Sequence, residues 1–234
     1  MKIIGRERLN RAAIEDRALN LLRLFKTDFL VFVQPTPVRE IAAFLTSKYD
    51  ILFDYTRVLG FSDTGQRILG AFNPRKRVIL IDASLNKDEP KFNFTLAHEL
   101  GHLALHRNIT IEYEDKDNLA NTSETIVEAG QEENAIESES DWLEWQANAY
   151  ASSLLMPKTI FEAALIVTQQ SMGIARAGKI MLDSQPVNMG DYYSIITQMA
   201  AFFQVSQTAA EYRLHKLDLV EDQRKLRSIK DILR

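Results

Sequence analysis

Two histidines four residues apart lie inside a segment that is apolar almost throughout, Phe92 to His106. On a helix, residues at this spacing are neighbours on one face, so His98 and His102 can direct their imidazoles to one point. A helix with apolar residues on nearly all sides is buried, and buried ring nitrogens need polar partners. The segment therefore predicts a core helix that carries a polar site.

The residues between the two histidines favour a metal site. His98-Glu99-Leu100-Gly101-His102 has the pattern H-E-x-x-H, in which both imidazoles bind zinc and the Glu acts as a general base. Zinc lowers the pKa of water to about 7, and Glu99 could then take its proton. Gly101 costs about 1 kcal/mol in a helix interior, which predicts close approach by another backbone. The alternative is a buried histidine pair that binds itself and neighbouring carbonyls.

A third ligand has to come from another segment. His106 continues the four-residue step, but eight helical residues rise about 12 Å, too far for three side chains to converge on one ion. Glu144 is the best candidate, because it lies on a helical face of small residues where a lone carboxylate would be unfavourable. Asn148, one turn later, is predicted to hold the outer nitrogen of a histidine ligand. The predicted site is Zn²⁺ with His98, His102 and Glu144 as ligands, Glu99 as catalytic base and Asn148 in support.

Composition restricts the chemistry and the partners. The chain has no cysteine, so disulfides and thiolate ligands are excluded, and metal ligands must be His, Asp or Glu. The net charge of -4 argues against a surface that binds nucleic acid throughout, although residues 1–26 carry seven Lys and Arg against three acidic residues. No signal peptide or membrane-spanning stretch is recognisable. We therefore expect a soluble cytoplasmic protein with no membrane partner.

Hydrophobic periodicity predicts an α+β protein that is mainly helical, with a small antiparallel sheet before the H-E-x-x-H helix. The expected helices cover residues 8–26, 38–49, 92–106, 141–155, 158–170, 191–203 and 206–217, and short β-rich runs fall between 51 and 82. Residues 112–141 are acidic and are interpreted as a long loop or partly disordered insertion. Residues 172–190 are expected to be a loop with little regular structure.

Three regions follow from this pattern. Residues 1–37 form an N-terminal helical segment. Residues 38–171 form a core with the acidic insertion at about 112–141. Residues 172–234 form a C-terminal helical region that could resemble a helix-turn-helix.

Several motifs, taken in order, resemble the ImmA/IrrE-type zinc metallopeptidases. The segments that carry the resemblance are PVREIA (37–42), TLAHELGHLALH (95–106), EWQANAYASSLLMP (144–157) and VSQTAAEYRLHKLDLV (205–220). The segment TLAHELGHLALH alone identifies only a zincin, whereas all four segments in this order are more specific. The chain departs from the family in the 42-position step from His102 to Glu144 and in Gln146, which replaces a frequent acidic residue.

The resemblance implies a zincin-like, more specifically gluzincin-like, fold with His98, His102 and Glu144 as zinc ligands and Glu99 as base. It also implies an endopeptidase that cleaves a helix-turn-helix transcriptional repressor by water attack on the peptide bond. An alternative is a non-catalytic anti-repressor that sequesters its regulator; three protein ligands favour catalysis, because structural zinc normally has four. Another is a DNA-binding regulator that uses residues 205–219 and the basic N-terminus, although Arg213, His215 and Lys216 are few for a phosphate-binding face.

Overall fold

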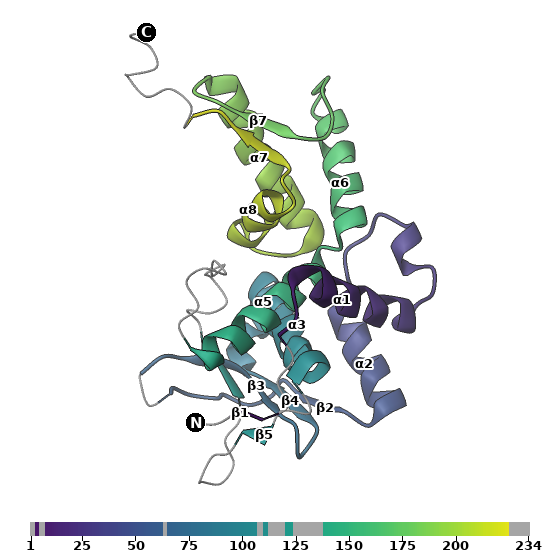
Figure 1. Cartoon of the computed structure of the whole chain (residues 1–234), viewed down its shortest axis with the longest axis vertical. Coiled ribbons are helices and arrows are strands. Elements are labelled where there is room, and N and C mark those ends of the chain that lie inside the picture. The colour runs from purple at the N-terminus through teal and green to yellow at the C-terminus, as the bar shows by residue number, and fades with distance from the viewer. Residues whose placement is uncertain are drawn as a thin grey trace.

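The computed structural model describes residues 3–4, 8–62, 65–106, 110–111, 120–123 and 138–224. They form two lobes (Figure 1). One lobe holds the main sheet with helices α1, α2, α3 and α5, and the other holds α6, α7 and α8. The chain passes between the lobes at Met156-Pro157, where α5 ends and α6 begins.

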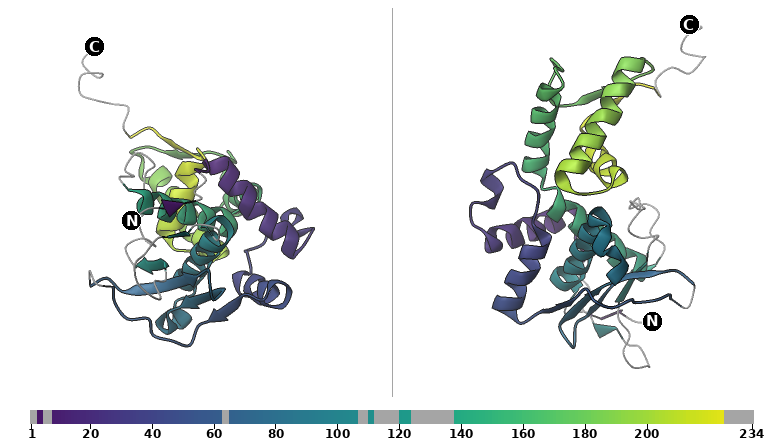
Figure 2. Two further views of the ribbon diagram at one scale, coloured as in Figure 1. Left: turned by 60° about the horizontal axis from the view of Figure 1, so that its bottom comes forward. Right: turned by 180° about the vertical axis from the view of Figure 1, so that it is seen from behind.

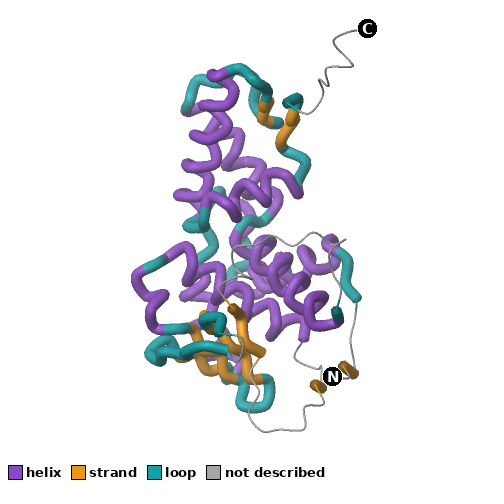
Figure 3. Tube along the Cα trace, turned by 90° about the vertical axis from the view of Figure 1, so that its left-hand side faces the viewer, coloured by secondary structure: helices purple, strands orange, loops and turns teal. Residues whose placement is uncertain are grey.

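Helices make up most of the described chain (Figure 3). Their bounds are α1 Arg11–Phe25, α2 Val38–Tyr49, α3 Glu89–His106, α5 Glu139–Leu155, α6 Lys158–Ser171, α7 Pro186–Phe203 and α8 Gln207–Lys216, with 3₁₀ turns at Phe29–Val31 (η1) and Ala83–Lys87 (η2). Each predicted helix is present; α2 has the predicted bounds, and the others differ from the prediction at one or both ends. Side-chain caps place some of these ends: Ser138 and Asp141 form a reciprocal capping box that starts α5 two residues earlier than expected.

The main sheet has the strand order β2 (Leu52–Asp54), β4 (Val78–Ile81), β3 (Ile68–Asn73) and β6 (Ala120–Ser123). The prediction that it is antiparallel is wrong for one pair, because β2 runs parallel to β4. β3 and β4 form an antiparallel hairpin, and β2 lies on the far side of β4 from β3. A sequence pattern indicates strands but not which strands are neighbours. It therefore could not show that β2 pairs with β4 rather than with β3, the next of these strands along the chain.

Two stretches expected to be loops contain strands. β6 lies within the acidic stretch and pairs antiparallel with β3, while most of residues 112–137 lie outside the described residues. β7 (Ile180–Leu182) pairs parallel with β8 (Val220–Asp222), and α7 begins at Pro186 rather than at 191. Both strands are too short to show alternation, and their partners are distant in the sequence. A further pair joins β1 (Ile3–Ile4) to β5 (Thr110–Ile111).

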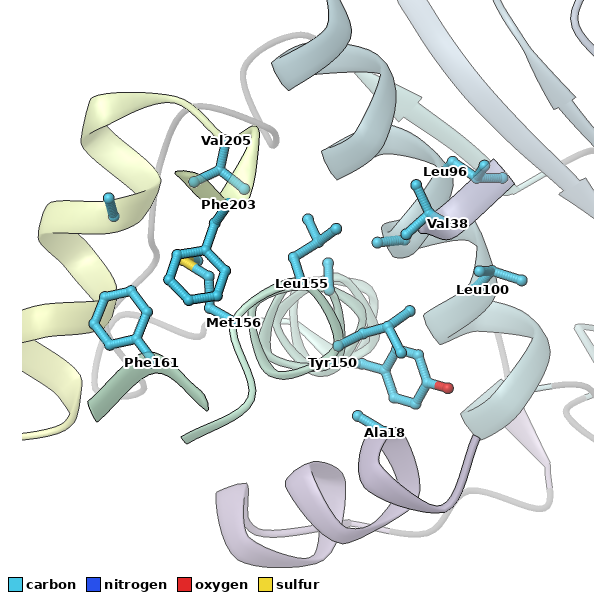
Figure 4. Packing of buried hydrophobic residues seen from close by; sticks show 14 of the residues in the cluster. Ala18, Val38, Leu96, Leu100, Tyr150, Leu155, Met156, Phe161, Phe203 and Val205 are labelled. Carbon is cyan, nitrogen blue, oxygen red and sulfur yellow. The ribbon is translucent and has the colours of Figure 1, made fainter. Parts of the chain in front are cut away.

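Helix α3 lies between the main sheet and α5 (Figure 2). Figure 4 shows α5 end-on, with Ala18 of α1, Leu100 of α3, and Phe161 and Phe203 of the other lobe gathered around it. All four side chains are almost completely buried. Because α5 is enclosed by both lobes, residues on it are held at fixed positions relative to α3.

Arg213 of α8 connects the lobes. Its Nε donates to the carbonyl of Met156 at 3.0 Å, and its Nη2 donates to Oε1 of Glu15 on α1 at 2.7 Å. The residue is only 6% exposed. Arg213 is thus not available to contact phosphate. Of the three candidate phosphate-binding residues on this helix, His215 and Lys216 remain for the DNA-binding hypothesis. Within the described ranges, no single helix is long and apolar enough to cross a membrane.

The buried carboxylate of Asp82 ties the loop before β3 to the end of β4. It accepts from the backbone N–H of Leu59 at 2.7 Å and of Ser84 at 3.0 Å, and its Oδ1 lies 3.1 Å from Nη2 of Arg67. Although burial by itself raises the pKa of Asp82, the hydrogen bonds from Ser84 and Leu59 and the charge of Arg67 lower it below its usual value. The fold therefore stabilises the ionised form.

Replacing Asp82 by Asn is expected to lower the free energy of unfolding by about 1–3 kcal/mol at pH 7, because a buried charged acceptor is lost. Since the pKa of Asp82 is lowered in the folded protein, its contribution is present above the unfolded pKa of about 3.9 and disappears as the pH falls through the folded value. Urea unfolding at pH 7 and at acidic pH measures both effects. Asp50→Asn, at an exposed left-handed helix end, is the control and should change little.

Candidate metal centre

Helix α3 brings the two predicted histidine ligands together in the core. His98 is completely buried and His102 is 4% exposed. Their Nε2 atoms lie 2.9 Å apart, so both rings direct the same nitrogen to one point. This is the arrangement expected from the four-residue spacing on a helix.

Glu144 on α5 completes the cluster. Its Oε2 lies 3.1 Å from Nε2 of His98, and its Oε1 lies 3.5 Å from Nε2 of His102. In a tetrahedral zinc site with bonds of about 2.0–2.1 Å, ligand atoms are about 3.3–3.4 Å apart. The two separations from Glu144 are close to this value, and the distance of 2.9 Å between the histidine Nε2 atoms is shorter. His98, His102 and Glu144 are therefore a group that could hold a metal ion.

Asn148 contacts the opposite nitrogen of His98. Its Oδ1 lies 2.8 Å from Nδ1 of that ring. An amide oxygen only accepts, so the contact places the proton of His98 on Nδ1 and leaves a lone pair on Nε2, toward His102 and Glu144. The structure thus brings Asn148 to the position that its spacing from Glu144 predicted.

The charges in the cluster favour a cation. Burial by itself would raise the pKa of Glu144, but the rings of His102 and His98 outweigh it and hold that pKa well below its usual range. Burial also opposes protonation of His102, yet Glu144, with a smaller contribution from Glu99, raises its pKa. The centre therefore contains an ionised carboxylate beside two imidazoles, which is a donor set suited to zinc.

Glu99 lies on the sheet side of the cluster. Its side chain is completely buried, and it faces Gly70 of β3. A Cβ on Gly70 would come within 2.5 Å of Oε1 of Glu99 and 2.8 Å of Cγ2 of Thr95. Gly70 thus leaves the space that the carboxylate occupies. Sequence reasoning missed this residue, although a glycine within a β-rich run is a signal for close approach.

Gly101 allows α3 to approach α5 closely. A Cβ at this position would lie 3.0 Å from Cα and 3.1 Å from the carbonyl oxygen of Ala147. The predicted approach of another backbone is therefore present, and it comes from the helix that carries Glu144. Closeness of the two helices is what allows a carboxylate on one to reach histidines on the other.

Gly101→Ala is expected to lower the free energy of unfolding by about 1–3 kcal/mol, because the added methyl group pushes against the backbone of α5. Thermal and urea unfolding measure this change. Gly190→Ala is the matched control: this glycine is also helical, and nothing lies within 4 Å of its added Cβ. The control should raise stability by about 0.4–1 kcal/mol. Equal effects of the two substitutions would contradict the close-packing explanation.

The part of the chain that contains this centre matches a known protein family. Residues 53–215 match the family of the IrrE N-terminal-like domain, which is a peptidase family. The chain belongs to this family. The matched range runs from β2 into α8 and contains both motif helices of the IrrE-like domain, whereas the PVREIA segment lies before it. Membership supports a metallopeptidase-like function.

The other comparisons are more distant. A solved structure of a Mycobacterium tuberculosis transcriptional regulator aligns with 85% of this chain at 14% sequence identity and a TM-score of 0.46. The chain spans 46% of the length of that protein. No curated protein matches the chain.

Proposed function

We propose that this IrrE-like protein is a zinc-dependent endopeptidase that cleaves a helix-turn-helix transcriptional repressor in the cytoplasm. The observation that carries the peptidase proposal is the meeting of His98, His102 and Glu144 within 2.9–3.5 Å. The buried carboxylate of Glu99 interacts electrostatically with His102 in this cluster. The substrate class is supported by the resemblance of the motif helices to ImmA/IrrE-type peptidases.

Each residue of the centre has a distinct part in this proposal. His98, His102 and Glu144 would hold zinc, which when bound would supply Lewis acidity. Glu99 takes the proton from the attacking water and passes it to the leaving amine. Asn148 holds the ring of His98 in the tautomer that ligation requires. Three protein ligands, one fewer than structural zinc sites normally have, favour a catalytic role for the centre.

Incubation with candidate repressors tests the proposal. The probe is the zinc-loaded protein mixed with helix-turn-helix repressors encoded near its gene, at about one enzyme per hundred repressor molecules. We expect complete conversion to two fragments, identified by mass spectrometry, which stops when zinc is chelated and resumes when zinc is restored. Zinc bound at one ion per chain with no cleavage of these repressors or of a mixed peptide library would contradict the proposal.

The same titration distinguishes an enzyme from an anti-repressor that only sequesters its regulator. An enzyme removes repressor function at a low molar ratio, and fragments accumulate with time. A binding protein needs one molecule per repressor and produces no fragments. Loss of operator binding only at equal concentrations would therefore replace the peptidase proposal by the binding one.

A further inference from the structure

A third histidine lies directly behind the metal cluster. His106 is too far along α3 to bind the same ion, and it is not among the three clustered ligands. Its Nδ1 nevertheless lies 3.0 Å from Nδ1 of His102, and the residue is only 8% exposed. A buried imidazole in contact with a proposed ligand, and with no part in the reaction described so far, needs an explanation.

The two rings can share this contact in only one way if His102 is a ligand. A neutral imidazole has one N–H and one lone pair, so ligation through Nε2 places the proton of His102 on Nδ1. That N–H then donates to Nδ1 of His106, which must be unprotonated. The opposite arrangement, with His106 donating, would move the proton of His102 to Nε2 and prevent ligation.

We infer that His106 is a positioning residue: it accepts the Nδ1–H of His102 and thereby holds that ring in the tautomer and orientation needed for zinc. Each ligand ring then has its own acceptor, an amide oxygen of Asn148 for His98 and an imidazole nitrogen of His106 for His102. The proton of His106 then lies on Nε2, because its Nδ1 is the acceptor. This inference rests on the proposed zinc site.

Zinc affinity of two variants tests the inference. His106→Leu removes the acceptor and keeps an apolar side chain of similar size, whereas the Oδ1 of His106→Asn can occupy the place of Nδ1 and accept the same hydrogen bond. We expect His106→Leu to bind zinc roughly 10–100-fold more weakly than the wild type in competition with a chelator. His106→Asn should remain within about threefold of the wild type, as expected where the accepted hydrogen bond is retained.

The outcomes separate this inference from the proposed function. A wild-type chain that binds no zinc overturns the proposed function, and the inference with it. A wild type that binds zinc while His106→Leu binds it equally well overturns the inference alone, as does an equal loss in both variants. Unfolding temperatures of the metal-free variants show whether a loss comes from misfolding.

Nuclear magnetic resonance of the wild type gives a test that does not depend on the variants folding. Long-range ¹H–¹⁵N spectra of the zinc-loaded protein should show His106 protonated at Nε2 and His102 protonated at Nδ1. Protonation of His106 at Nδ1 would overturn the inference.

Discussion

Replacing Glu99 by Gln is expected to reduce peptide-bond cleavage by roughly 10²–10⁴-fold, because the amide cannot accept a proton from water. The substitution nearly preserves size, so the packing against Gly70 should be retained. Zinc content should remain one ion per chain, because Glu99 is not one of the three clustered ligands. Turnover of a cleaved repressor, with zinc measured on the same sample, gives both quantities.

Glu139→Gln is the matched control for this experiment. Glu139 is exposed in the first turn of α5, five residues before Glu144, and lies outside the cluster. It should keep wild-type turnover. Full activity of Glu99→Gln would remove Glu99 as the general base, whereas loss of zinc together with activity would show that the substitution disturbs the ligands instead.

Glu144→Gln is expected to remove the stabilisation of the folded protein by zinc. For the wild type, zinc at a thousand times its dissociation constant should add about 4 kcal/mol to the free energy of unfolding. At about 2–4 °C per kcal/mol for a chain of this size, this corresponds to roughly 10 °C in the unfolding temperature. The variant lacks the anionic ligand between the two rings, so zinc should raise its unfolding temperature by far less.

Thermal unfolding with and without zinc measures this difference, and Glu139→Gln again serves as the control with a wild-type shift. An equal zinc-induced shift in Glu144→Gln would show that the ion binds elsewhere in the chain or without this carboxylate. The experiment does not use the substrate, so it tests the metal centre separately from the peptidase reaction.

Local features of the sequence predicted the parts of the site that lie on one helix. The four-residue spacing of His98 and His102 determines that they share a face, because helix geometry is regular. Gly101 indicated a close backbone, which the structure identifies as that of Ala147. Glu144 could be chosen because it lies on a helical face of small residues, where a lone carboxylate would be unfavourable. Its contact with both rings agrees with that choice.

Other features could not be predicted because they depend on contacts between distant segments. Gly70 is 29 positions from Glu99, and only the docking of α3 on β3 gives it a role. The parallel pairing of β2 with β4 depends on the order of strands in the sheet. Arg213, a candidate for phosphate contact by its charge, is buried against Met156 and Glu15.

The sequence by itself determined the chemistry available to this protein: a buried helix with two imidazoles and a carboxylate, and no thiol. It also excluded His106 as a third ligand, because the rise of a helix is fixed. Only the tertiary structure decided which residues from other segments complete the site around these groups. Packing of α3 against α5 brings Glu144 to the rings, β3 encloses Glu99, and His106 contacts His102, because distances between segments arise from packing rather than from spacing along the chain.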